Sequence, residues 1–190
     1  MVLEKVRLAT AENHQYLEAQ LLPYLEHIDT KDQYGTLLNA FYGYIHPVQE
    51  LIHSNIDTTV VPDIQKRRNA ALILGDLDSL GLPLSNERST SLPAISDHAS
   101  AMGALYVLEG STLGGKIISK KIADRLNITE GLLFFRGYGS ETGPMWKDFT
   151  QYLEHPANQE HAEKLAYTAS ETFRLFGTWF ENQLSIVKQS

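Results

Sequence analysis

The sequence of 190 residues contains no cysteine. This absence excludes disulfide bonds, thiolate metal ligands and a cysteine nucleophile, so any metal chemistry must use histidine or carboxylate side chains. Long apolar runs are also missing, and residues 1–7 carry no apolar core of signal-peptide length. We therefore expect a cytoplasmic protein that contains no transmembrane segment and has no membrane partner.

Positive charge is scarce as well, with 16 lysine and arginine residues against 23 aspartate and glutamate residues and a formal net charge of -7. Nucleic acids and anionic membrane surfaces favour clustered basic residues, so neither is an expected partner. Hydrophobic residues make up 43% of the chain, which is enough for one compact core. Because no repeat, low-complexity tract or linker interrupts it, we expect one domain over residues 1–190.

Sustained alternation of β-branched residues is absent too, so helices are the main structural signal. Apolar residues recur at spacings of three and four, which is typical of amphipathic helices. This pattern predicts an all-α fold with helices over residues 2–25, 34–52, 63–80 (beginning at Pro62 or Asp63), 98–126, 145–153 and 159–187.

Residues with capping chemistry stand at the ends of several predicted helices. Thr30 is the expected N-cap of the second helix, and Asp97 or Ser96 that of the helix beginning at residue 98. Gly81 is the expected C-cap of the third helix. Residues 81–93 and 131–144, which are rich in glycine, proline or serine, are expected to connect helices.

The first predicted helix carries a candidate ligand-binding face. Arg7, His14 and Glu18 are spaced by seven and four residues, and Thr10 lies one turn before the histidine, so all four share nearly one face. A neutral imidazole is a good ligand for haem iron, a carboxylate one turn away could accept its other N–H, and a cation could pair with a propionate. A surface or structural histidine is the commoner explanation of such a pattern.

Glycines concentrate in the helix predicted over residues 98–126. Gly103, Gly110, Gly114 and Gly115 fall within thirteen residues, although each helical glycine costs about 0.5–1 kcal/mol relative to alanine. Gly110 and Gly114 share a face with Tyr106, and the missing Cβ atoms would let the backbone approach a planar macrocycle. Close packing of two helices through small residues explains the same spacing and is the more common cause.

Four tracts together resemble a known family. The tract Tyr106-Val-Leu-Glu-Gly-Ser-Thr-Leu-Gly-Gly115 is similar to the glycine-rich distal helix of bacterial haem oxygenases, and Leu8-Ala-Thr-Ala-Glu-Asn-His14 resembles their proximal helix. Phe134-Phe-Arg-Gly-Tyr-Gly139 and Met145-Trp-Lys-Asp-Phe149 resemble the biliverdin-forming members associated with bacterial phytochromes. The resemblance covers nearly the whole chain. It implies a multi-helical bundle with haem between a proximal helix and a kinked, glycine-rich distal helix.

The resemblance assigns roles on the proximal side and around the propionates. His14 corresponds to the residue that ligates the iron, and Glu18 to the carboxylate beside it. Arg7 stands where family members often have a lysine that contacts a propionate, and Tyr106 matches a tyrosine with the same role. Thr10, on the same face of the first helix, completes the expected haem-binding set there.

The resemblance also implies the distal side of the site. Gly110, Gly114 and Gly115 match the glycines over the distal face, and Phe173 lies where the last helix lines the pocket. Ser111 replaces an aspartate that organises distal water in animal members. We expect the backbone near Gly110 and the Ser111 hydroxyl to order that water, and therefore predict a catalytic role for both.

The implied activity is oxidative cleavage of haem b, which is both substrate and cofactor, to biliverdin, carbon monoxide and iron. Dioxygen and an electron donor such as a ferredoxin or a flavin reductase are the implied partners, and a phytochrome could receive the biliverdin. Lys116, Lys120 and Lys121 are expected to form a solvated face, with docking of an acidic donor as the alternative. A haem carrier or sensor that does not degrade its ligand would need the same binding residues.

A di-iron oxidase is a further possibility for a helical bundle, and it requires repeated Glu-x-x-His pairs on facing helices. Glu50 and His53 form one such pair, and the sequence contains no second one. We therefore interpret this pair as part of the protein surface.

Overall fold

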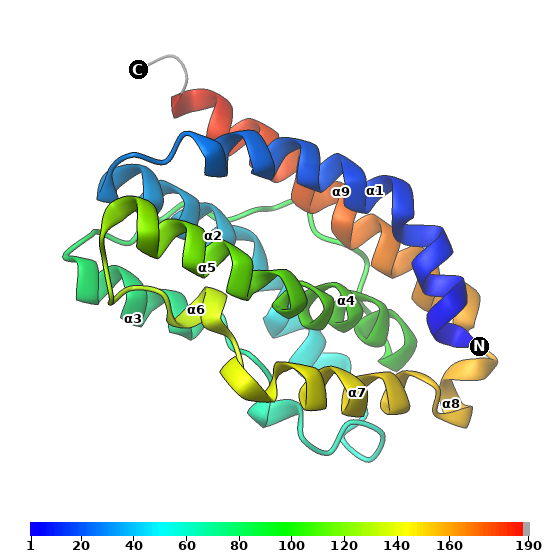
Figure 1. The fold of residues 1–190 in the computed structure, drawn as a ribbon. Helices are drawn as coiled ribbons and strands as arrows, with labels where there is room; N and C mark the ends of the chain where they lie inside the picture. Colours follow the sequence, from blue (N-terminus) through cyan, green and yellow to red (C-terminus); the bar gives the residue numbers. More distant parts are fainter. Residues whose placement is uncertain (188–190) are drawn as a thin grey trace.

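The computed structural model describes residues 1–187, and within that range it contains helices and connecting segments but no β-strand. The predicted all-α fold is confirmed (Figure 1). The helices are α1 (Val2–Glu26), α2 (Lys31–Asn55), η1 (Ile64–Lys66), α3 (Ala71–Leu80), α4 (His98–Gly110), α5 (Thr112–Leu126), α6 (Leu133–Arg136), η2 (Gly139–Glu141), α7 (Thr142–Leu153), α8 (Pro156–Gln159) and α9 (Ala162–Val187).

The long helices lie around a core rich in aromatic residues. Helix α9 packs along α1 and α4, and Figure 1 shows α1 and α9 side by side along one edge of the molecule, with α4 and α5 below them. Phe41 of α2 lies at the centre, with four phenylalanine rings 5.0–5.7 Å from its own: Phe134, Phe135, Phe176 and Phe180. These rings join α2, α6 and α9, and edge-to-face packing of this kind adds to the stability from apolar burial.

The predicted caps are present. Thr30 accepts a hydrogen bond from the backbone N–H of Gln33, whose side chain accepts one from the Thr30 backbone. Asp97 caps α4 in the same way, with Ser100 as its partner. Gly81 ends α3 with a φ of 68°, in the left-handed region that favours glycine.

The helix predicted to begin at Pro62 or Asp63 is wrong over its first half, because α3 begins at Ala71. Side chains bind the preceding segment in place of helical backbone bonds. The Asp63 carboxylate accepts from the Arg67 guanidinium, and Gln49 of α2 accepts from the backbone N–H of Ala70. Arg67 has an extended backbone (φ -70°, ψ 152°), which turns successive side chains to opposite sides.

The helix predicted over residues 98–126 is two helices, α4 and α5, separated at Ser111. Side chains satisfy the backbone carbonyls at the break. The Ser111 hydroxyl donates to the carbonyl of Leu108 at 2.7 Å, and the Thr112 hydroxyl donates to that of Glu109 at 2.6 Å. The break stands where the resemblance implied a bend in the distal helix.

Two further boundaries differ from the prediction. The connection over residues 131–144 contains the short helices α6 and η2, and α7 begins at Thr142, so that Pro144 lies in its first turn, where proline is tolerated. The last long helix begins at Ala162, because residues 156–159 form the separate helix α8. Over residues 1–187, no helix is both long and apolar enough to cross a membrane.

Candidate active site

A cavity of about 680 Å³ is lined by residues of α1 and α9 and, across from α1, of α4 and α5. Its volume falls within the range of about 300–1,000 Å³ that is usual for cofactor sites. Much of the wall is apolar and includes Leu17, Leu21, Ile45, Val107 and Phe176. The polar residues on it include most of those predicted from the sequence: Arg7, Thr10, His14, Glu18, Tyr106 and Ser111.

His14 lies on the wall formed by α1, with half of its side chain exposed. Its ring meets that of Phe173 edge to face, with centroids 5.0 Å apart. Nε2 lies 3.7 Å from a carboxylate oxygen of Glu18, which is too long for a hydrogen bond but close enough for electrostatic attraction. Asn13 donates to the hydroxyl of Ser170 at 2.8 Å and so ties α1 to α9 beside the histidine.

Arg7, Thr10 and Tyr106 lie together on the cavity wall formed by α1 and α4. Burial raises the pKa of the Tyr106 phenol, while a hydrogen bond with Thr10 and the charge of Arg7 act in the opposite direction. Thr10 is almost fully buried, whereas Arg7 is exposed. The Thr10 hydroxyl donates to the Val6 carbonyl at 2.8 Å, so the Arg7 cation and the Tyr106 hydroxyl are the groups here that are suited to binding a carboxylate.

Packing accounts for two of the four glycines between Gly103 and Gly115 on α4 and α5. A Cβ atom on Gly103 would lie 2.3 Å from the backbone oxygen of Leu165, and one on Gly115 would lie 2.2 Å from that of Phe135. Backbone atoms cannot move aside easily, so both glycines allow close packing of helices. Gly115, which the resemblance places over the distal face of the ligand, lies against α6 and is not among the residues that line the cavity, and its contact with the ligand stays a prediction.

Packing does not account for the other two glycines. A Cβ atom on Gly114 would have no neighbour within 4 Å, and one on Gly110 would touch only the indole of Trp146, at 3.8 Å. Both residues line the cavity. Packing thus explains Gly103 and Gly115, whereas the missing Cβ atoms of Gly110 and Gly114 leave the α4–α5 backbone open toward the cavity.

Arg68 also lines the cavity, and the sequence analysis missed it. Its Nη2 atom donates to the Leu108 carbonyl at 3.0 Å and to the Ser111 hydroxyl, and its guanidinium lies 4.3 Å from the centre of the Phe134 ring. Burial lowers the pKa of Arg68 to about 10, so the side chain stays charged near neutral pH. The Ser111 hydroxyl uses its proton in the bond to the Leu108 carbonyl, and Arg68 brings a positive charge to the same wall.

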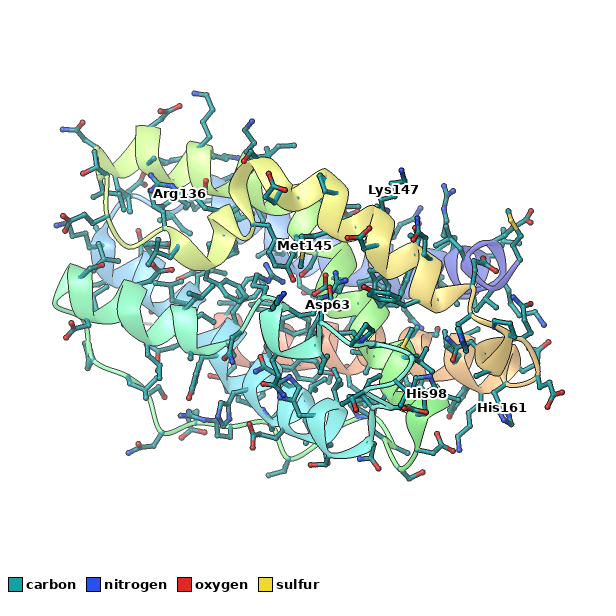
Figure 2. The ribbon with its side chains drawn as sticks, turned by 90° about the horizontal axis from the view of Figure 1, so that it is seen from below. Asp63, His98, Arg136, Met145, Lys147 and His161 are labelled. Atoms are coloured by element: carbon teal, nitrogen blue, oxygen red, sulfur yellow. The ribbon has the colours of Figure 1, made fainter. Side chains whose placement is uncertain are left out.

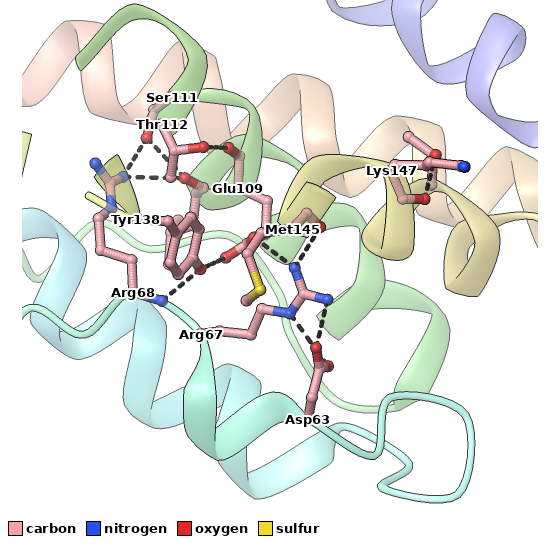
Figure 3. Close-up of polar contacts among 11 residues, drawn as sticks. Asp63, Arg67, Arg68, Glu109, Ser111, Thr112, Tyr138, Met145 and Lys147 are labelled. Carbon is pink, nitrogen blue, oxygen red and sulfur yellow. Dashed lines mark hydrogen bonds and ion pairs between the residues drawn. The ribbon is translucent and has the colours of Figure 1, made fainter. Parts of the chain in front are cut away.

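Behind this wall lies a buried polar network (Figure 3). One carboxylate oxygen of Glu109 accepts from Arg67 Nη1 at 2.9 Å, and the other accepts from the Tyr138 hydroxyl at 2.8 Å. Tyr138 accepts in turn from the backbone N–H of Arg68 at 2.6 Å, and Arg67 also binds Asp63.

Figure 2 shows Asp63 and Met145 near the middle of the molecule, with His98 and His161 toward one end.

His14 is the histidine on the cavity wall, and this suits a metal ion whose other ligands come from a bound cofactor. Residues 1–187 contain no group of three or more histidine, aspartate and glutamate side chains placed to hold an ion. A di-iron centre needs several such ligands. A single accessible imidazole on an apolar cavity fits a metal carried in a macrocycle, where the macrocycle supplies the in-plane ligands.

Comparisons of the sequence and the fold with known proteins lead to one family. The family described as Heme oxygenase matches residues 1–182. Heme oxygenase PigA of Pseudomonas aeruginosa is 29% identical over 181 residues, which cover 94% of this chain and 90% of that protein. A heme oxygenase of Xanthomonas campestris pv. campestris is 30% identical over 128 residues, or 67% of this chain and 75% of that one.

The heme oxygenase from Leptospira interrogans, a solved structure, shares the fold with a TM-score of 0.74 at 20% identity, and the match covers 95% of this chain and 98% of that one. With a family match from residue 1 to residue 182 and the same helical arrangement, this chain belongs to the haem oxygenase family.

Proposed function

We propose that this protein is a haem oxygenase that binds haem b in the cavity, with His14 as the iron ligand, and cleaves it to biliverdin, carbon monoxide and iron. One observation carries the proposal beyond family membership. The imidazole of His14 on α1 is accessible from the apolar cavity. Gly110 and Gly114 line the same cavity, and they have no side chains of their own to cover the backbone. A flat ligand held between them would contact the His14 imidazole and the backbone of Gly110 and Gly114.

Bound haem supplies the iron at which dioxygen is activated and is itself the molecule oxidised. The protein's part is to orient it. His14 would donate its imidazole nitrogen, while Phe173 fixes the ring and Glu18 attracts its remaining N–H. Arg7 and the Tyr106 hydroxyl would bind propionates and so set the in-plane orientation of haem, while Thr10 lines the cavity beside them.

The distal wall would control access and water. Gly110 and Gly114 remove side chains that would otherwise occupy the space over the macrocycle. Arg68 brings a positive charge to the same wall and suits the ordering of water there. We propose that Arg68 shares with the Ser111 oxygen and the Gly110 backbone the role first assigned to those two groups.

The reaction also needs electrons from a partner. We propose a ferredoxin or a flavin reductase, supported by the exposed lysines Lys116, Lys120 and Lys121 on α5, whose residues Leu113 and Gly114 line the cavity. Delivery of biliverdin to a phytochrome is a further proposal, supported by the resemblance of the tracts 134–139 and 145–149 to phytochrome-associated members.

One experiment tests binding and turnover in sequence. Haemin is titrated into the purified protein, and ascorbate or a reductase system is then added in air. We expect a Soret band typical of histidine ligation, followed by its conversion to the biliverdin spectrum. A haem spectrum that persists under reductant would indicate a carrier or sensor, and absence of binding would refute both functions. A His14→Ala variant with normal binding and turnover would overturn the ligand assignment.

A further inference from the structure

Three residues of the tract from Phe134 to Gly139 lie against Arg68. The Phe134 ring lies under the Arg68 guanidinium, with 4.3 Å between the guanidinium carbon and the ring centre. The Tyr138 hydroxyl accepts from the Arg68 backbone N–H at 2.6 Å. A Cβ atom on Gly137 would lie 3.9 Å from Arg68 Cδ, so this glycine runs beside the aliphatic stem. One short segment thus contacts the main chain, stem and head group of Arg68.

The backbone around Tyr138 adopts a conformation that glycine allows. Gly137 has φ 54° and ψ -122°, a region that other residues rarely enter, and Gly139 has φ 59°. The two glycines turn the chain sharply on either side of the tyrosine and direct its hydroxyl inward. This geometry explains why the sequence reads Gly-Tyr-Gly at a position that does not itself line the cavity.

Glu109 fixes the other side of the hydroxyl. The tyrosine donates to one carboxylate oxygen of Glu109, and Arg67 donates to the other. Glu109 is 1% exposed, and a buried carboxylate persists only when both oxygens are bound. Arg67 is held further by Asp63 and by the Met145 carbonyl at 2.8 Å. The hydroxyl of Tyr138 is therefore fixed in direction, as donor and as acceptor.

We infer that Tyr138 and Glu109 are positioning residues that hold Arg68 at the break between α4 and α5, and that they set through it the protonation of the distal side of the haem site. The inference rests on the proposed function for its second half only. An arginine side chain is flexible and loses considerable rotamer entropy when it is fixed. The contacts from residues 134–138 keep it beside Ser111, where its charge would lower the pKa of nearby water.

The first test uses the protein without haem, so that it does not depend on the proposed function. In Tyr138→Phe, we expect the ¹⁵N-resolved NMR signal of the Arg68 Nε–H group, assigned by its loss in Arg68→Lys, to move and to exchange faster with solvent. The matched control is Tyr34→Phe, which also removes a hydroxyl from a buried tyrosine, one that donates to the Gly131 carbonyl at 2.7 Å. An Arg68 signal that is unchanged in Tyr138→Phe would overturn the inference.

The second test measures the consequence in the haem complex. The pH at which the ferric haem spectrum changes from its acidic to its alkaline form should rise in Tyr138→Phe by a few tenths of a pH unit or more, and should not change in Tyr34→Phe. In an Arg68→Met background, the Tyr138→Phe change should have no further effect. An equal shift in both backgrounds would show that Tyr138 does not act through Arg68. Failure of haem to bind would instead refute the proposed function.

Discussion

At the scale of single residues, neighbouring glycines do different things. Gly114 and Gly115 are adjacent on α5, yet one borders the cavity and the other lies against the Phe135 carbonyl. A sequence pattern shows that glycine is tolerated but not which atoms would meet a Cβ. That information comes from tertiary contacts, whereas Gly115 was placed in the binding set by the family resemblance alone.

Alanine at these two positions should therefore have opposite effects. Gly115→Ala would force a Cβ against the Phe135 carbonyl, and we expect the free energy of unfolding to fall by about 1–3 kcal/mol. Gly114→Ala should leave the empty protein as stable or make it about 0.5–1 kcal/mol more stable, because alanine favours helix. It should, however, weaken haem binding. Urea denaturation and haemin titration measure the two effects, and normal haem affinity of Gly114→Ala would show that this glycine is not kept for the ligand.

The candidate site could be predicted from the sequence where its residues share one helix. Arg7, Thr10, His14 and Glu18 line the cavity from α1, as their helical spacing indicated. Arg68 could not be found in this way. Its partners Leu108 and Ser111 are 40 and 43 residues away, and local pattern carries no signal for such contacts.

At the scale of elements, helix ends were predictable where a local side chain caps them. Thr30, Asp97 and Gly81 each act within a few residues of their own position. The segment before α3 was not predictable, because Arg67 there is bound by Glu109, 42 residues away. Tertiary bonds of buried charged groups thus outweigh the helix propensity of residues 63–70.

The cap of α4 makes a pH-dependent contribution to stability. A hydrogen bond from Lys164, aided by the N–H of Ser100, holds the pKa of Asp97 well below its ordinary value. The folded protein therefore binds this proton less readily than the unfolded chain. The resulting stability is fully present above the unfolded pKa of about 3.9 and is lost as the pH falls through the lower folded pKa.

Removal of the Asp97 charge alone should reveal this pH-dependent contribution to stability. Asp97→Asn keeps a good capping residue but loses the ion pair with Lys164 and the favourable interaction with the helix dipole. Since both side chains are about half exposed, we expect a loss of only about 0.5–1 kcal/mol at pH 7. The difference from the wild type should shrink below about pH 4 in urea denaturation curves. A difference that is constant with pH would rule out the carboxylate charge as its source.

At the scale of the whole molecule, the cavity lies between α1 and the α4–α5 pair, and hydrogen bonds hold α1 to other helices. The Glu154 carboxylate accepts from the backbone N–H groups of Val2 and Leu3 at 3.0 and 2.8 Å, which ties the start of α1 to the end of α7. Farther along, Asn13 binds Ser170 of α9. Between α1 and the α4–α5 pair lies the cavity, and a ligand that contacts both would add bonds across it.

Haem should therefore stabilise the entire fold. At a free haem concentration 100 times the dissociation constant, binding to the folded state alone contributes about 2.7 kcal/mol. For a chain of this length that corresponds to a rise in Tm of about 5–10 °C. Circular dichroism melting with and without haemin tests this, with His14→Ala as the control in which the rise should be much smaller. An unchanged Tm would contradict specific binding to the folded protein.

The buried network around Glu109 and the side chain of His14 are held by different contacts. Within residues 1–187, His14 contacts Phe173 and Glu18, whereas Tyr138 contacts Arg68 and Glu109, so the two share no partner. Substitutions at His14 and Tyr138 should then be additive in the empty protein. A macrocycle that touched both walls would couple them. The departure of the two free-energy changes from additivity when haem is added would thus measure the coupling between the two walls. The bound haem that transmits this coupling is also the molecule that the reaction consumes.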